Sequence, residues 1–361
     1  MNKNTRALST LFLGLTAILA GFISLGLSYN AASYLLIGGI VLTAISFRFI
    51  PSLRGFSYTT WIFAAVAVSM FHPQLFTNVG GLPLKTLILP LLQLIMFGVG
   101  STMGIRDFEG VIKMPKPVLI GIVCQFTIMP LVGYTIANTF GFPPEIAAGI
   151  ILVGCVPSGL ASNVMSYIAN ANVALSVTLT AVATLLAPVI TPFLMQQLAG
   201  SFIQVEFMAM MMDIIKIVIA PIGAGLLFNH FLGGKFPWLD RAMPMVSMIS
   251  IGAIITIITA AGRDSLIEVG LLLVLACLIH NLAGYILGYY SCKLLRMDEK
   301  SCRTIAIEVG LQNGGLASGL ALSMGKLVAL APAIFGPLMN ITGSTLASYW
   351  HNRPITEESE K

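Results

Sequence analysis

Residues 154–165 read GCVPSGLASNVM, and residues 308–318 read EVGLQNGGLAS. The four letters GLAS occur in both stretches, beginning at Gly159 and again at Gly315, an offset of 156 residues. Each copy follows polar or helix-breaking residues in the middle of an apolar segment, with Pro157 before the first and Asn313 before the second. Because Pro and Gly interrupt helices, the two stretches predict broken helices near 157–159 and near 310–315.

The rest of the chain is too apolar and too sparsely charged for a soluble domain. Of its 361 residues, 57% are hydrophobic and 9% are charged, against about 25% charged in ordinary domains. This composition excludes a cytosolic enzyme, a nucleic-acid binder and a disordered chain, and it indicates a polytopic, all-α protein in a lipid bilayer. The five cysteines contain no CxxC pair, so we expect neither disulfides nor a metal cluster.

Twelve apolar segments of roughly membrane-spanning length follow one another along the chain. We predict spans at 8–28, 32–47, 57–72, 82–103, 117–139, 144–169, 172–196, 207–230, 242–262, 266–293, 304–324 and 328–350. With the N-terminus inside, 15 of the 19 Lys and Arg residues fall on the cytoplasmic side. This asymmetry predicts an inner (plasma) membrane protein with both termini cytoplasmic. The first segment has a signal peptide as its alternative reading, but its long apolar run favours an uncleaved helix.

The two GLAS copies lie in the sixth and eleventh segments, which are five crossings apart and therefore run in opposite directions. This arrangement is typical of an inverted repeat of two five-helix units, here segments three to seven and eight to twelve. Each break directs the N-terminus of a half-helix, with free N–H groups and partial positive charge, towards the other. Such a pair of helix ends suits an anion. We expect the bound anion to face Ser158, Gly159, Asn313 and Gly314, with Asn340 as a further contact.

Glu308 lies just before the second break, where a carboxylate costs at least about 2.5–3.5 kcal/mol near the bilayer midplane. It is either a cation ligand or a protonated acid bonded to a carbonyl, and the oxygens of Gln312 and Asn313 nearby favour the cation. A second polar group contains Ser162 and Asn163 after the first break, with Ser176 and Thr180 one turn apart on the next segment. These oxygens suit a small hard cation, although Ser and Thr in membrane helices also bond to their own backbone.

Three other polar positions have two readings each. Cys155 is a thiol ligand or a packing residue, and His280 with Asn281 relays protons or braces helices. Asp213 and Lys216 form an ion pair on one helix face, or Lys216 extends to the membrane surface. In each case we favour the structural reading.

Three motifs in order resemble the bile acid:sodium symporter family: Gln125 and Phe126 with Met129 and Pro130; GCVPSGLASNVM continuing through 172–177; and Glu308 to Asn313. The resemblance covers about residues 57–350. It implies ten helices in two inverted repeats, divided into a panel domain and a core domain whose broken helices cross. Residues 1–56 are then two additional helices. The domains are 57–103 and 201–262 for the panel, 104–200 and 263–350 for the core, and 351–361 for a cytoplasmic tail.

Carried over by position, the resemblance implies two sodium sites and no cofactor. One site uses Ser162, Asn163, Ser176, Thr180 and Glu308. The other uses Gln125, Glu308, Gln312 and the main-chain oxygens of Val309 and Leu311. Two departures affect the substrate: many relatives have Gly where this chain has Ser158, and some have His at the position of Met339.

We therefore expect a symporter of two Na⁺ and an organic anion, which is bile-acid-like, pantoate-like or another small carboxylate, working by alternating access. The alternatives are an exporter of the same superfamily, such as an arsenite carrier using Cys155, and a sodium or ligand sensor that transports nothing. An intramembrane enzyme is disfavoured because the chain has no HExxH or GxSxG motif.

Overall fold

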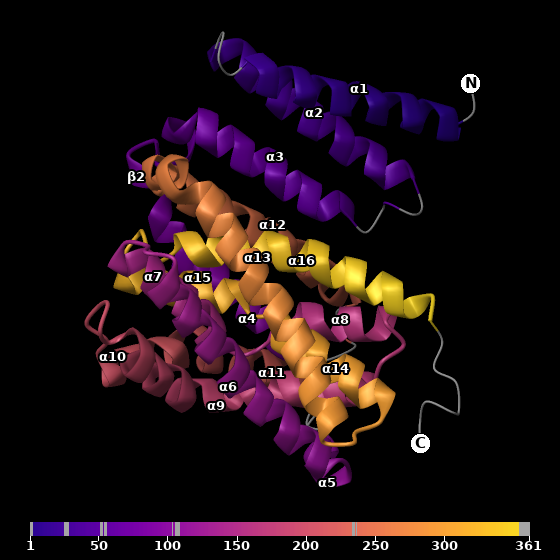
Figure 1. The fold of residues 1–361 in the computed structure, drawn as a ribbon, viewed down its shortest axis with the longest axis vertical. Coiled ribbons are helices and arrows are strands. Elements are labelled where there is room, and N and C mark those ends of the chain that lie inside the picture. The colour runs from indigo at the N-terminus through magenta and orange to yellow at the C-terminus, as the bar shows by residue number, and fades with distance from the viewer. Residues whose placement is uncertain are drawn as a thin grey trace. The chain divides into compact units, whose positions relative to one another are not determined.

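The computed structural model describes residues 3–24, 29–50, 53, 56–102, 104, 109–232, 235 and 237–353. Nearly all of this part of the chain is helical (Figure 1), and it gathers into two compact units. The first unit contains Met1–Thr86 and Gly252–Arg263, and the second contains Leu87–Ile251 and Asp264–Lys361. The predicted tail lies outside the described residues from 354 onwards.

Among the described residues, seven helices are long and apolar enough to cross a membrane. They are Arg6–Ser24, Ala31–Phe49, Leu84–Thr102, Pro115–Thr139, Val173–Ala199, Phe207–Leu232 and Arg263–Leu294. Shorter apolar helices include Pro144–Cys155 and Gly314–Met324, which adjoin the two predicted breaks. The prediction of an all-α polytopic membrane protein is confirmed.

The first unit begins with a close helical hairpin of α1 (Lys3–Ser24) and α2 (Tyr29–Phe49), followed by α3 (Ser57–Phe71). Two glycines permit the close approach of α1 and α2, since a Cβ at Gly14 would lie 2.9 Å from the Gly39 carbonyl oxygen. Small residues at such an interface are typical of helix packing in membranes.

The predicted span 82–103 contains the apolar helical run Leu84–Thr102, but its first two residues belong to a strand. After a 3₁₀ turn (Pro73–Phe76), strands β1 (Asn78–Val79) and β2 (Leu82–Pro83) form a small hairpin. Gly80 and Gly81 form its turn at φ +57° and +83°, a conformation that glycine adopts without strain. A second 3₁₀ turn (Leu84–Leu87) then leads into α4, which begins at Ile88.

The second unit contains the remaining helices, and α12 ends in the first unit. They are α4 (Ile88–Thr102), α5 (Glu109–Lys113), α6 (Pro115–Thr139), α7 (Pro144–Cys155), α8 (Leu160–Ile168), α9 (Val173–Ala199), α10 (Phe207–Ile214), a π-helical turn (Ile215–Ile219), α11 (Ala220–Leu232), α12 (Pro237–Ala261), α13 (Arg263–Leu294), α14 (Glu299–Gly310), α15 (Gly314–Met324) and α16 (Leu330–His351).

Both predicted helix breaks are confirmed. Helix α7 ends at Cys155 and α8 begins at Leu160, while α14 ends at Gly310 and α15 begins at Gly314. The two connecting segments cross as extended chains: Ser158 pairs with Gln312 in an antiparallel bridge. The Asn313 N–H donates to the Pro157 carbonyl at 2.8 Å. The crossing therefore satisfies backbone groups that a helix break would leave unpaired inside a membrane.

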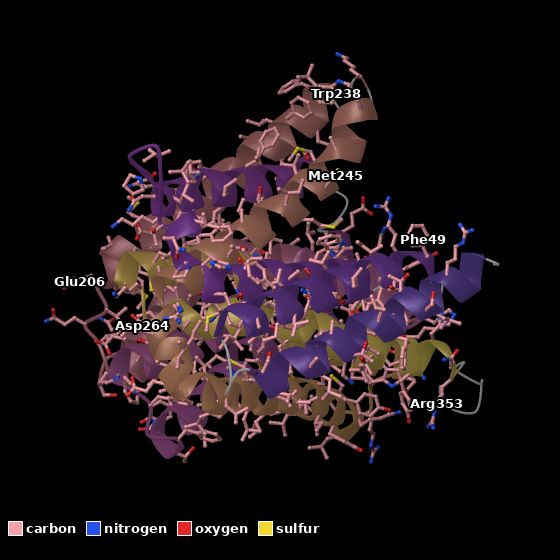
Figure 2. All side chains as sticks on the ribbon, turned by 90° about the horizontal axis from the view of Figure 1, so that it is seen from above. Phe49, Glu206, Trp238, Met245, Asp264 and Arg353 are labelled. Carbon is pink, nitrogen blue, oxygen red and sulfur yellow. The ribbon has the colours of Figure 1, made fainter. Side chains whose placement is uncertain are left out.

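The outer surface carries large apolar side chains, as expected for helices that face lipid. Phe49, Trp238 and Met245 are 62%, 66% and 64% exposed (Figure 2). The charged residues Glu206 and Asp264 lie at helix starts and are exposed. Polar groups that are buried inside the second unit therefore need a separate explanation.

Candidate functional site

Glu308 is a buried carboxylate surrounded by hydroxyl groups. It lies on α14, is 2% exposed, and accepts hydrogen bonds from Ser176 Oγ at 2.5 Å and Ser158 Oγ at 2.5 Å. Thr180 Oγ1 donates to its two oxygens at 3.1 and 3.3 Å. Within the described part of the chain no Lys, Arg or His forms an ion pair with this carboxylate.

The neighbouring helix α9 brings its hydroxyls to Glu308 because hydrogen bonds join it to α14 one turn earlier on each helix. The Asn172 N–H donates to Thr304 Oγ1 at 2.9 Å, and Thr304 donates back to the Asn172 carbonyl at 3.2 Å. One turn onward on each helix, Ser176 meets Glu308, and Thr180 follows on the same face of α9.

Helix α8 contributes the remaining oxygens of this group. Asn163 Oδ1 lies 2.8 Å from Ser176 Oγ and 3.3 Å from Thr180 Oγ1, and Ser162 Oγ lies 3.3 Å from Thr180 Oγ1. We call Ser162, Asn163, Ser176, Thr180 and Glu308 the Glu308 cluster. The structure brings together all five residues predicted for the first sodium site.

A second group of oxygens lies beside the crossing. Gln125, on α6, donates from Nε2 to Gln312 Oε1 at 2.8 Å and to the Val156 carbonyl at 3.1 Å. Gln312 Nε2 donates to the Val309 carbonyl at 2.6 Å. Gln125 Oε1 is buried without a hydrogen-bond partner. We call these two side chains with the carbonyls of Val156 and Val309 the Gln125 cluster.

The Gln125 cluster contains most, but not all, of the second predicted sodium site. No hydrogen bond in the described structure joins Glu308 to Gln125 or Gln312, so its role as a shared ligand stays a prediction. Leu311 lies in the extended segment at the break and is buried. Since a buried amide oxygen without a partner is costly, Gln125 Oε1 fits an added hard cation.

The helix ends at the crossing are more accessible than the buried side chains of the two clusters, of which only Asn163 is also partly exposed. Gly159 and Gly314 are partly exposed, whereas Ser162 and Gln312 are buried. Asn313 uses its side-chain oxygen to cap α15, accepting from the Leu316 N–H at 3.0 Å. Its predicted contact with an anion is therefore limited to groups left free by this cap.

Asn340 lies on α16 and donates to the carbonyl of Gly336 in the same helix at 2.9 Å. A Cβ added to Gly314 would lie 3.5 Å from Gly336 Cα, so this part of α16 packs directly against the start of α15. Asn340 is partly exposed one turn away. The structure thus places it near the second break.

The favoured structural readings of His280 and Asn281 fit their contacts. His280 is 1% exposed, with Nε2 2.9 Å from the Met129 carbonyl oxygen. Asn281 Nδ2 donates to the Gly310 carbonyl at 2.8 Å, which satisfies the last residue of α14 before the break. Both side chains therefore brace backbone beside the crossing.

Of the two readings of Asp213 and Lys216, the structure does not show the ion pair: no salt bridge joins them in the described residues. They lie on either side of the start of the π-helical turn, where the Lys216 carbonyl accepts from Gln93 at 3.3 Å. Cys155 is fully buried, which agrees with packing.

Sequence reasoning missed a second buried charged group, at the start of α14. Glu299 accepts from Arg303 Nε at 3.0 Å and lies 2.7 Å from Lys293 Nζ. Arg303 also donates to the carbonyls of Ala169 at 3.3 Å and Trp350 at 3.2 Å, joining the ends of α8 and α16. We call Lys293, Glu299 and Arg303 the Arg303 cluster. The four-residue spacing of Glu299 and Arg303 was visible in the sequence, but surface pairs share it.

The electrostatics of Glu299 follow from these partners. Burial alone would raise the pKa of its carboxyl group, but hydrogen bonds from Lys293, Arg303 and Tyr289 outweigh it. They hold the pKa of Glu299 below its usual value. Glu299 is therefore an ionised acid neutralised by the protein itself.

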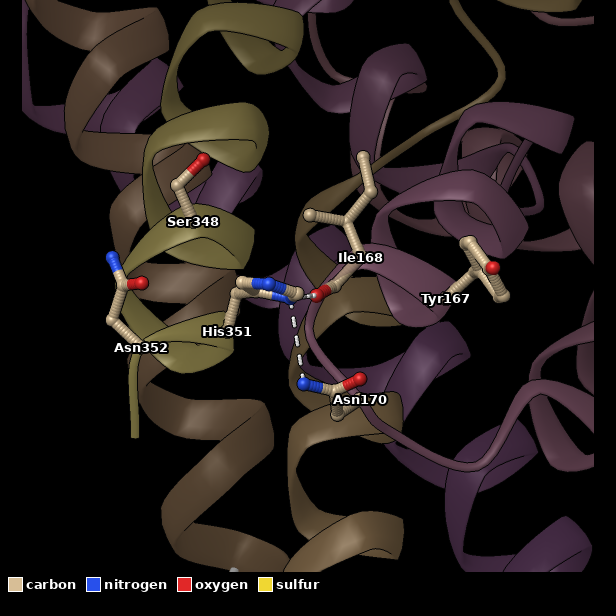
Figure 3. Close-up of a pocket in the computed structure, with 6 residues that line it drawn as sticks. All are labelled: Tyr167, Ile168, Asn170, Ser348, His351 and Asn352. Carbon is tan, nitrogen blue, oxygen red and sulfur yellow. Dashed lines mark hydrogen bonds between the residues drawn. The ribbon is translucent and has the colours of Figure 1, made fainter. Parts of the chain in front are cut away.

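A pocket of about 400 Å³ lies beside the same helix ends, lined by Tyr167, Ile168, Asn170, Ser348, His351 and Asn352. His351 Nδ1 is 2.9 Å from the Ile168 carbonyl oxygen and 3.4 Å from Asn170 Nδ2 (Figure 3). The other polar side chains point in different directions and do not converge on one point (Figure 3). The pocket thus joins α8 to α16 but lacks the geometry of a substrate site.

Comparison with known proteins shows the family of this chain. The sodium bile acid symporter family matches residues 89–269, which include α7, α8 and most of the Glu308 cluster. The sodium-dependent transporter YocS of Bacillus subtilis is 40% identical over 307 residues, covering 85% of this chain and 94% of its own. The chain belongs to this family.

Plant relatives in the same family are also similar along most of the chain. The probable sodium/metabolite cotransporter BASS1 of Arabidopsis thaliana chloroplasts is 32% identical over 306 residues, covering 84% of this chain and 75% of its own. The probable chloroplast cotransporter BASS3 of Oryza sativa is 35% identical over 296 residues, covering 81% and 69%. Membership in this family makes the protein a sodium-coupled membrane transporter.

Proposed function

We propose that the protein is a secondary symporter that carries Na⁺ and an organic anion across the membrane by alternating access. The observation that carries this proposal is Glu308, a buried carboxylate with hydroxyl partners, with which no cationic side chain of the described residues forms an ion pair. It lies directly behind a crossing at which two helix N-termini are partly exposed.

Na⁺ is a co-transported substrate in this proposal, and the donors fit it. A hard cation prefers carboxylate, amide, hydroxyl and carbonyl oxygens, which are the groups in both clusters. Glu308, Ser162, Asn163, Ser176 and Thr180 would hold one ion. Gln125, Gln312 and the carbonyls of Val309 and Leu311, with Glu308, would hold the other.

The anion would bind at the ends of α8 and α15. Helix N-termini carry free N–H groups and partial positive charge, so together they favour a carboxylate. Gly159 and Gly314 have no side chains that would block its approach, and both are partly exposed. Asn340, partly exposed near the second break, is the neighbouring polar contact.

Coupling between the ions and the anion follows from the extended segments that they share. The residues between α7 and α8, and between α14 and α15, belong to the clusters on one side and begin the exposed helix ends on the other. Ions that fix these segments would align the N–H groups that bind the anion. The anion site is thereby incomplete without Na⁺.

The larger architecture that we propose has twelve spans and both termini in the cytoplasm. Two additional helices come first, and an inverted repeat of two five-helix units follows. The antiparallel pairing at the crossing supports the opposite orientation of the two broken helices. Alternating access would come from the panel (57–103, 201–262) moving against the core (104–200, 263–350).

Uptake into proteoliposomes tests this function. The anions are pyruvate, pantoate and taurocholate, each supplied with an inward Na⁺ gradient or with K⁺ in its place. Two Na⁺ with one monoanion move one net charge, worth about 2.3 kcal/mol per 100 mV, so an inside-negative potential should accelerate uptake. Na⁺-dependent anion binding without flux would favour a sensor, and flux only in the opposite direction would favour an exporter.

A further inference from the structure

Ser158 contacts both oxygen clusters. Its hydroxyl donates to Glu308 Oε2 at 2.5 Å and lies 3.4 Å from Thr180 Oγ1, so it belongs spatially to the Glu308 cluster. Its backbone pairs with Gln312, a member of the Gln125 cluster, in the antiparallel bridge at the crossing.

The side chain points to the ion side of the crossing, not to the anion side. Ser158 is 1% exposed, whereas the next residue, Gly159, is partly exposed and begins the accessible end of α8. A hydroxyl buried against a carboxylate is not free to contact an anion, which the same carboxylate would repel.

A hydroxyl in this place can serve a cation as well as a carboxylate. It has one hydrogen to donate and two lone pairs, and it rotates to suit its partners. Towards Glu308 it acts as a donor, and towards a cation held by Glu308 and Thr180 its lone pairs act as a ligand. Hard cations are surrounded by several oxygens, about six to eight in the case of Ca²⁺, whereas one oxygen from each residue of the Glu308 cluster gives five.

We propose that Ser158 is a sixth ligand residue of the sodium site at Glu308, and that through its backbone pairing with Gln312 it links this site to the Gln125 cluster. This inference rests on the proposed function and deepens it. A chain with Gly at this position keeps the crossing backbone but loses one oxygen of the site. Ser158 thus sets the sodium affinity of this chain.

The test is a sodium titration of thermal stability in detergent, with choline replacing Na⁺, for the unchanged chain and for Ser158→Ala, Ser158→Gly and Ser158→Thr. The Ala and Gly variants should need roughly tenfold more Na⁺ for half-maximal stabilisation, the size of effect expected when a metal site loses one supporting contact. Ser158→Thr keeps the hydroxyl and should stay close to the unchanged chain.

Ser166→Ala is the matched control. Ser166 is also a fully buried serine on α8, about two turns beyond the same break, but its hydroxyl has no hydrogen-bond partner. Its removal should leave the sodium titration unchanged. Melting temperatures without Na⁺ show which variants fold. If Ser158→Ala does not fold, Ser158→Gly is the variant that decides the test.

Two results overturn the inference, and they are distinguishable. If the unchanged chain responds to Na⁺ and both Ser158→Ala and Ser158→Gly respond at the same or lower concentrations, Ser158 is not a ligand and the proposed function stands. If the unchanged chain shows no stabilisation by Na⁺, both the inference and the proposed function fail.

Discussion

Glu299 and Glu308 lie nine residues apart on the same short helix, and both are buried, at 7% and 2% exposure. Glu299 has two cationic side chains of the protein as partners, Lys293 and Arg303. Glu308 has hydroxyl donors, and none of the described cationic side chains forms an ion pair with it. Glu299 is therefore a structural acid that the protein itself neutralises, whereas at Glu308 we propose an exchangeable cation as the compensating charge.

The largest expected effect is the loss of Na⁺-driven uptake when Glu308 is replaced. Glu308→Gln removes the charge and should reduce Na⁺-driven uptake at least about 100-fold, since loss of about 3 kcal/mol of site energy already has this effect. Glu145→Gln, at an exposed acid in the first turn of α7, is the matched control and should transport normally. If Glu308→Gln transported at the rate of this control, Glu308 would not be the acid that binds the coupling ion, and its contrast with Glu299 would fail.

The complementary substitution removes Arg303, one of the two cationic partners of Glu299. Arg303→Met leaves a buried acid with one cation fewer and three carbonyls without their donor, so we expect a loss of about 3 kcal/mol in unfolding free energy. Arg353→Met, at an exposed residue stacked on Tyr349, should cost less than about 1 kcal/mol. Denaturant unfolding in detergent measures both. Equal losses in the two variants would show that Arg303 is not a structural partner.

A smaller effect is expected from the second cluster. Gln125→Leu removes the buried oxygen that has no partner and the donor to Gln312, while the Glu308 cluster stays intact. Na⁺ activation of uptake should then need roughly tenfold more Na⁺ and become less steep, because one of two cooperating sites is weakened. The Na⁺ dependence of uptake at fixed anion concentration measures this, and an unchanged steepness would count against a second site.

The smallest effect is a pH dependence from Glu299. Its pKa is lowered in the folded protein, so its stabilising contribution is complete above the ordinary glutamate pKa and is lost as the pH falls through the lower, folded value. The stability difference between the unchanged chain and Glu299→Gln should therefore be constant near neutral pH and shrink in acid. Melting temperatures from pH 7 downwards test this, and a difference that grows in acid would reverse the sign.

Local sequence signals predicted the broken helices well. Pro157 and the glycines near 314 interrupt helices by their own chemistry, so the breaks lie where they were expected. The hairpin at Gly80 and Gly81 was missed although its turn residues are visible, because the long apolar run that follows favoured a helix from residue 82.

The site was only partly predictable, since its contacts join residues far apart in the chain. The spacing of Ser176 and Thr180 indicated one helix face. The family resemblance supplied Gln125, and it placed Ser176 and Thr180 in one site with Glu308. The direction of the Ser158 side chain depends on how the two extended segments cross, which no local pattern determines. The role of Arg303 depends on three backbone carbonyls from other parts of the chain, those of Ala169, Trp350 and Arg353, which no local sequence pattern indicates.

Equilibrium binding of ²²Na⁺ to the purified protein tests the central claim most directly, using the unchanged chain, Glu308→Gln and Glu299→Gln. We predict that the unchanged chain and Glu299→Gln, where it folds, bind Na⁺ saturably, and that Glu308→Gln loses this binding while keeping its melting temperature without Na⁺. Full Na⁺ binding by a folded Glu308→Gln variant would contradict the assignment of Glu308 as the acid that holds the transported ion.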